Sequence, residues 1–213
     1  MKTNDLIAML GTNVEPVSRG QLARTVGASL LIGAGAALGT MLLAFGIRTD
    51  LSHANAWRFL VVKVLFTVGM TLVASIYLFG IARPTVEQKT PSIPLALPFV
   101  AIMLLAAISL ASAPATHWSK MIAGDRWLEC LLSIPAIAIA PFAAIVWAIR
   151  RMAPTDLERA GGLAGLVAGG VSATGYALHC TDDSLPFIAL WYSATIALCT
   201  IAGAKLGPRL LRW

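Results

Sequence analysis

The chain has 213 residues, of which 58% are hydrophobic and only 12% carry a charge. A soluble globular domain carries about 25% charged residues, so this composition excludes an ordinary soluble enzyme or binding domain. The formal net charge of +6 does not indicate direct binding of nucleic acid, because the basic residues are spread along the chain instead of clustering in one polar domain.

The first 24 residues form a polar, mixed stretch, which we expect to lie in the cytoplasm. We expect no cleavable signal peptide, because the first apolar run begins only at Val26 and is too long for one. Leu6, Ile7 and Leu10 form a small apolar cluster within this stretch. Such a segment is typical of a peptide that docks on a partner protein, and equally of a helix that lies on the membrane surface.

Six apolar stretches follow, each close to the 20 or so residues that a membrane-spanning helix needs. The sequence therefore predicts an all-α, polytopic membrane protein with a six-helix transmembrane domain over residues 25–206 and a short tail over 207–213. One charge, Lys63, lies within a stretch, near its end, where a lysine can extend to the lipid headgroups. The predicted spans are 26–47, 59–82, 91–115, 131–149, 160–178 and 184–204.

The distribution of basic residues predicts the orientation of these spans. With the N-terminus inside, 11 of the 16 lysines and arginines lie in inner segments, four in outer segments and one within a span. Short cytoplasmic loops favour lysine and arginine, so both termini are expected in the cytoplasm. The outer side then holds most side chains that could bind a metal or undergo redox chemistry: His53, His117, His179, Cys130 and Cys180.

Glycines four residues apart recur in three of the predicted spans. This spacing lets helix backbones approach closely in a membrane. The rows indicate packing inside the bundle or the seam of a homodimer. Separately, Pro135 and Pro141 predict a bend in the fourth span. The glycine rows are Gly35 and Gly39, then Gly161, Gly165 and Gly169, then Gly203 and Gly207.

The sequence contains no phosphate-binding loop, dinucleotide fingerprint, zinc-protease motif or nucleophile elbow. The middle of the spans also lacks the acid or histidine that a proton-coupled transporter normally needs. We therefore expect neither an enzyme nor an ion-coupled pump, and no cofactor.

Two cysteines are expected to lie close together at the outer side. The fourth and fifth spans are joined by a short inner loop, so their outer ends, which carry Cys130 and Cys180, should be neighbours. Three interpretations remain open: a disulfide in an oxidising compartment, a pair of free thiols that bind a soft metal or react with an oxidant, and inert, part-buried cysteines.

The second cysteine lies in a polar loop with His179, Asp182 and Asp183. These side chains could add ligands or alter the acidity of a thiol. Alternatively, the aspartates could cap the last span, which begins directly after them. No zinc-type spacing is present, so the sequence specifies no particular metal.

These features resemble the NrsF family of bacterial inner-membrane anti-sigma factors. The resemblance implies that the N-terminal segment holds an extracytoplasmic-function sigma factor and that the outer cysteine motifs carry the signal that releases it. A small-molecule or metal transporter and a membrane assembly protein are the alternative functions. The resemblance rests on residues 1–7, on Trp127-x-x-Cys130-Leu131-x-x-Ile134-Pro135 and on His179-Cys180-x-Asp182-Asp183-Ser184-x-x-Phe187-x-x-x-Trp191-Tyr192.

Overall fold

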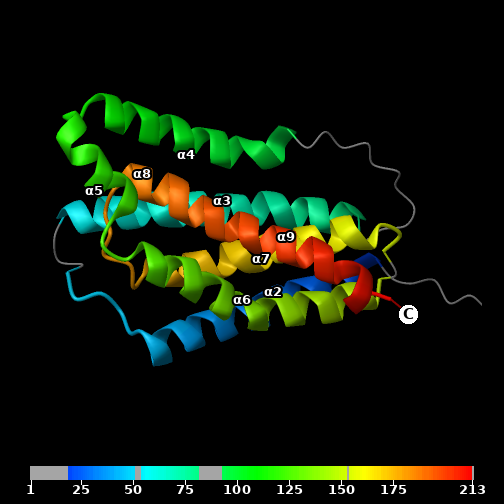
Figure 1. The fold of residues 1–213 in the computed structure, drawn as a ribbon. Coiled ribbons are helices and arrows are strands. Elements are labelled where there is room, and N and C mark those ends of the chain that lie inside the picture. The colour runs from blue at the N-terminus through cyan, green and yellow to red at the C-terminus, as the bar shows by residue number, and fades with distance from the viewer. Residues whose placement is uncertain (1–18, 51–53, 82–92, 153, 213) are drawn as a thin grey trace, which may run out of the picture.

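The computed structural model describes residues 19–50, 54–81, 93–152 and 154–212, and within these ranges it contains helices and no strand. The fold is therefore all-α, as predicted. Six of the helices are long and run back and forth as a bundle (Figure 1). The elements in chain order are α2 (Arg19–Ala44), α3 (Ala54–Ile81), α4 (Ile93–Ala111), the 3-10 turn η1 (Ala115–His117), α5 (Trp118–Ala123), α6 (Trp127–Arg150), α7 (Leu157–Ala177), α8 (Leu185–Phe187), the π-helix η2 (Ile188–Tyr192) and α9 (Ser193–Leu210).

Helix α7 forms the centre of the bundle and packs against α2, α3, α6 and α9. Fifteen of its 21 residues are buried. Five other segments of the described chain are long and apolar enough to cross a membrane, whereas α7, the predicted fifth span, is not among them. A helix surrounded by other helices needs small residues for close packing more than it needs apolar bulk toward lipid.

Glycines bring α7 and α9 into backbone contact. A Cβ atom added at Gly161 would lie 2.3 Å from the carbonyl oxygen of Gly203, and one at Gly165 would lie 2.2 Å from that of Cys199. These rows therefore serve packing inside the bundle. By contrast, a Cβ atom at Gly35 or Gly39 on α2 would meet nothing within 4 Å, so the homodimer interpretation stays open for that row alone.

Prolines do not interrupt the long helices. Helix α6 runs through Pro135 and Pro141, and α9 continues past Pro208 to Leu210, beyond the predicted end of the last span. In the last span, the π-helix η2 follows the short α8, and the sequence did not predict this irregular turn. The helices thus keep the predicted number and order, with ends shifted by a few residues.

The connections after α2, after α4 and after α7 meet at one end of the bundle, at the left of Figure 1. This is the end that the charge distribution predicts to be outside, and we call it the outer end. The C-terminal end of α9 and the beginning of α7 lie at the opposite end. Which end faces the cytoplasm stays a prediction.

Candidate functional site at the outer end

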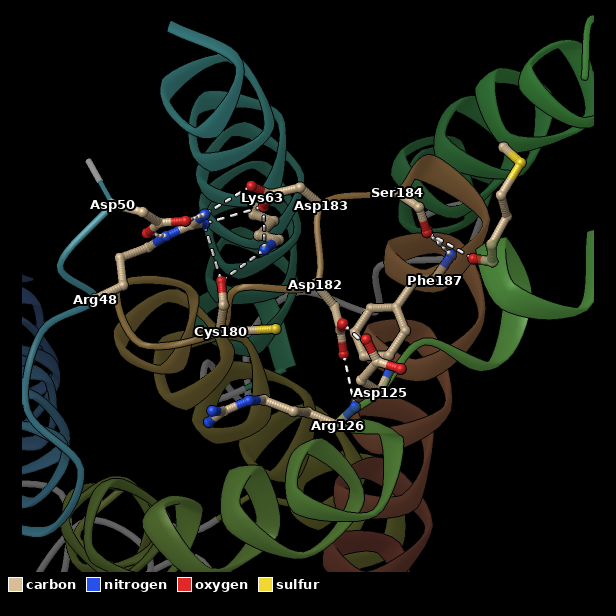
Figure 2. Close-up of polar contacts among 11 residues, drawn as sticks. Arg48, Asp50, Lys63, Asp125, Arg126, Cys180, Asp182, Asp183, Ser184 and Phe187 are labelled. Carbon is tan, nitrogen blue, oxygen red and sulfur yellow. Dashed lines mark hydrogen bonds and ion pairs between the residues drawn. The ribbon is translucent and has the colours of Figure 1, made fainter. Parts of the chain in front are cut away.

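The loop between α7 and α8 is held by two buried cations from other parts of the chain. The side chains of Arg48, after α2, and Lys63, in α3, have no exposed surface. Both bind the carboxylate of Asp183, at 2.6 Å from a terminal guanidinium nitrogen and 3.0 Å from Nζ (Figure 2). The loop is thereby tied to two other elements of the fold.

The same two cations also hold the backbone of the loop. Arg48 donates a hydrogen bond of 3.0 Å to the carbonyl oxygen of Cys180, and Lys63 donates one of 2.9 Å to the same oxygen. Arg48 further pairs with Asp50 at 2.6 Å, so two cations face two carboxylates. The hydrogen bonds that Arg48 donates to Asp50 and then to Asp183 raise the pKa of its guanidinium above the ordinary value.

The expectation that Lys63 extends to the lipid headgroups is wrong. The residue is the tenth of α3, and its ammonium group points into the bundle toward Cys180 and Asp183. A charge at this depth needs partners more than it needs solvent. Two acceptors from the α7–α8 loop bind the Lys63 ammonium group. The apolar pattern of the sequence around Lys63 could not predict these acceptors, because they come from a distant part of the chain.

Asp182 and Asp183 do not cap the last span, which corrects a second expectation. Asp182 instead accepts hydrogen bonds from the backbone N–H groups of Asp125 at 3.2 Å and Arg126 at 2.8 Å, directly before α6. The side chain that caps α8 is that of Ser184, which accepts from the N–H of Phe187.

Further contacts join the last span to α5. Ser184 donates a hydrogen bond of 2.6 Å to the carbonyl of Met121, and the indole of Trp191 donates one of 2.9 Å to Ile122. The chain turns between α5 and α6 at Gly124, whose φ of 62° favours glycine. A Cβ atom there would lie 2.5 Å from the ring of Phe187, so a larger residue would be excluded on two grounds.

His179 faces the end of α2. Its Nδ1 atom lies 3.2 Å from the carbonyl oxygen of Gly46, to which it can donate a hydrogen bond. Its ring packs against Phe45 at 5.3 Å and against Tyr176 at 5.8 Å between centroids. His179 therefore contacts the chain after α2, whereas Asp182 binds the backbone before α6.

Cys130 and Cys180 both come to lie inside the outer end of the bundle. Each is a free thiol without exposed surface, and both belong to the same cluster of buried residues. No group of three or more histidine, cysteine, aspartate or glutamate side chains among the described residues is arranged to hold a metal ion. Cys199 lies away from this pair, against Gly165 and Gly169 of α7.

All five predicted signal-sensing residues lie at the outer end: Cys130 in α6, and His179, Cys180, Asp182 and Asp183 in the α7–α8 loop. The structure adds two residues that sequence reasoning missed, Arg48 and Lys63, which hold this loop. The only signal for Lys63 was its position as a lone cation in an apolar run. Leu6, Ile7 and Leu10, predicted to bind a partner, lie outside the described residues.

The fold and this site define a polytopic α-helical membrane protein whose outer loops are held together by buried ion pairs. Comparison with known families matches residues 10–213 to NrsF, described as "Negative regulator of sigma F". The chain belongs to this family. No solved structure matches it.

Two curated relatives match over the full length of both chains. The probable anti-sigma-F factor NrsF of Azospira oryzae is 32% identical over 213 residues. The anti-sigma-F factor NrsF of Caulobacter vibrioides is 32% identical over 218 residues. The resemblance expected from the cysteine motifs is confirmed.

Proposed function

We propose that this chain is an anti-sigma factor of a bacterial inner membrane, which sequesters an extracytoplasmic-function sigma factor and releases it on a signal from the periplasm. The full-length match to two anti-sigma-F factors carries the proposal. The family is regulatory, which favours this function over an enzyme. A transporter is disfavoured because the buried charges of the site pair with one another at the outer end instead of lining a path through the bundle.

The sigma factor binds the cytoplasmic segment of residues 1–24 in this proposal. The apolar face of Leu6, Ile7 and Leu10 is the docking surface, because it is the apolar cluster of an otherwise polar segment. Fully burying a leucine or isoleucine side chain stabilises a complex by about 1.5–3 kcal/mol. Two or three such side chains would therefore contribute about 3–9 kcal/mol to binding of the partner.

Replacing Leu6 and Leu10 together with aspartate tests this docking surface. We expect binding of the purified sigma factor to weaken at least about tenfold, and transcription from its target promoters to rise. The matched control is Thr12→Asp with Asn13→Asp, which adds the same charge to the same segment outside the apolar face. If the double aspartate variant binds and represses like the wild type, the docking surface lies elsewhere.

The signal acts at the outer end, on the pair Cys130 and Cys180, with His179, Asp182 and Asp183 shaping their surroundings. Either of two changes would move α6 relative to the α7–α8 loop. An oxidant from the periplasm could take two electrons from the thiols, which lose two protons and form a disulfide, or a soft cation could bridge the two sulfur atoms. Two contacts support transmission: Asp182 binds the beginning of α6, and Lys63 connects the loop to α3. A shift of the loop therefore reaches two long helices that run to the inner end.

A further inference from the structure

Four side-chain hydroxyl groups in the described part of the chain are buried and lack a hydrogen-bond partner: those of Ser172, Tyr176, Tyr192 and Ser193. Native proteins pair nearly all their buried polar groups, because an unpaired one is costly. These unpaired buried hydroxyl groups therefore need an explanation. One explanation is that they form hydrogen bonds in another state of the protein, in which a ligand is bound.

The two tyrosines lie beside the cysteine pair. Neither ring has exposed surface, and their centroids are 6.5 Å apart. Both rings and both cysteines belong to the same cluster of buried residues. The backbone N–H of Cys180 donates a hydrogen bond of 3.0 Å to the carbonyl oxygen of Tyr176. Two sulfur atoms and two unpaired hydroxyl donors thus lie in one buried region of the bundle.

The backbone of the last span supports a functional role for Tyr192. This residue ends the π-helix η2, and single π-helical turns occur mostly as local irregularities that are frequent at functional sites. Its neighbour Trp191 leaves the core and donates to the carbonyl of Ile122, whereas Tyr192 remains fully buried. At the end of the π-helix, Trp191 therefore anchors the span to Ile122, whereas Tyr192 stays in the buried cluster that contains both cysteines.

We propose that Tyr176 and Tyr192 complete the thiol site as hydrogen-bond donors to the sulfur atoms when these bind a soft, thiophilic cation. A thiol is a weak acceptor, whereas a metal-bound thiolate carries charge and accepts strongly. Each sulfur that binds the cation releases its proton to solvent, so two thiols bound to one cation release two protons. The inference rests on the proposed sensing role of Cys130 and Cys180.

In this proposal, the tyrosines stabilise the cation-bound state of the protein relative to the cation-free state. Their hydroxyl groups gain partners only when the sulfur atoms become charged, so the interaction contributes to cation affinity and not to the stability of the empty protein. Hydrogen bonds from outside the ligand set tune metal affinity in this way in other proteins. Because no third ligand is arranged among the described residues, the cation must accept two sulfur ligands, which soft cations do.

Silver ion binding to the purified full-length chain in detergent tests the proposal, with Ag⁺ as the probe and a chromophoric chelator as competitor. We expect Tyr176→Phe and Tyr192→Phe each to weaken Ag⁺ binding by about tenfold or more. Their unfolding temperature without Ag⁺ should stay equal or rise, because each substitution removes an unpaired buried hydroxyl. The control is Tyr77→Phe, on the inner half of α3, which should bind Ag⁺ as the wild type does.

Wild-type Ag⁺ affinity in both phenylalanine variants would overturn the role of the tyrosines. A weaker affinity accompanied by a lower unfolding temperature of the empty protein would overturn it too, because that pattern marks a structural role. The double variant Cys130→Ser, Cys180→Ser separates this inference from the proposed function. Unchanged Ag⁺ binding in that variant would contradict the proposed cysteine site itself. Loss of Ag⁺ binding in that variant, together with normal binding in the tyrosine variants, would contradict only the role of the tyrosines.

Discussion

At the scale of single residues, Asp183 is the point where the two buried cations of the outer end meet. Lys63 and Arg48 approach it from elements that are 120 and 135 residues away in sequence. Removing one partner from a buried charge network leaves the others uncompensated, whereas removing both can be nearly neutral. The network therefore makes the position of the α7–α8 loop sensitive to one carboxylate.

We expect Asp183→Asn to lower the free energy of unfolding by about 3–5 kcal/mol, because Lys63 then has no carboxylate partner. The double variant Lys63→Met, Asp183→Asn should recover part of this loss, since Arg48 keeps Asp50. Denaturant unfolding in detergent measures both. Asp125→Asn, at an exposed aspartate of the same end, serves as the control. Equal losses in the single and double variants would show that the pair is not coupled.

The cysteines give a second prediction at this scale. In strains exposed to an oxidant or a heavy metal, Cys130→Ser and Cys180→Ser should each alter induction of the target promoters, because the proposed function assigns both thiols to one sensing site. Cys199→Ser should respond as the wild type does, since that thiol packs against α7 away from the pair. A normal response in the Cys130→Ser, Cys180→Ser double variant would end the sensing proposal.

At the scale of elements, the seam between α7 and α9 depends on the absence of side chains. Gly161, Gly203 and Gly207 place the two backbones so close that each added Cβ atom would lie 2.3–2.4 Å from a carbonyl oxygen of the other helix. The helices cannot relax such a contact by rotating one side chain. The central position of α7 is therefore set by glycine at a few positions and not by apolar bulk.

We expect Gly161→Ala to lower the free energy of unfolding by about 1–3 kcal/mol, the usual cost of overpacking a well-packed core. Gly35→Ala is the matched control. Its Cβ atom meets nothing within 4 Å, and alanine favours a helix by about 1 kcal/mol over glycine. Thermal unfolding compares the two variants. If Gly35→Ala instead dissociates a dimer, measured by light scattering in detergent, the α2 row is a homodimer seam.

At the scale of the whole molecule, the bundle has two chemically different ends. The outer end gathers Asp182, Asp183 and both paired cysteines around one loop, and the opposite end carries the exposed arginines of the α6–α7 connection and of the C-terminal end of α9. A signal received at one end and a partner held at the other require helices that span the distance between them. Six long helices supply that connection.

Topology can be tested directly with reporter fusions. A reporter that is active only in the cytoplasm should work when fused after Asn13 and after Trp213, because the inner excess of lysine and arginine predicts that both termini lie there. A reporter fused within the α4–α5 connection, near Ala113, should be active only when it is a periplasmic one. Periplasmic activity at either terminus would contradict the six-span arrangement.

The sequence by itself determined the class of fold, the order and approximate limits of the long helices, and the family. Each of these depends on local properties: the length of an apolar run, or a motif such as the one around Cys130. The packing of α6 against α7 also followed from the short loop between them, because short connections make adjacent helices antiparallel.

Only the tertiary structure decided what the polar side chains do. Lys63 points inward because its acceptors come from a loop more than a hundred residues away, and Asp182 supports the beginning of α6 across a gap of 56 residues. In a bundle that buries its charges, each one must find a partner, and that partner is chosen by the packing of helices. The sequence pattern indicates that a buried charge needs a partner, but it does not indicate which residue that partner is.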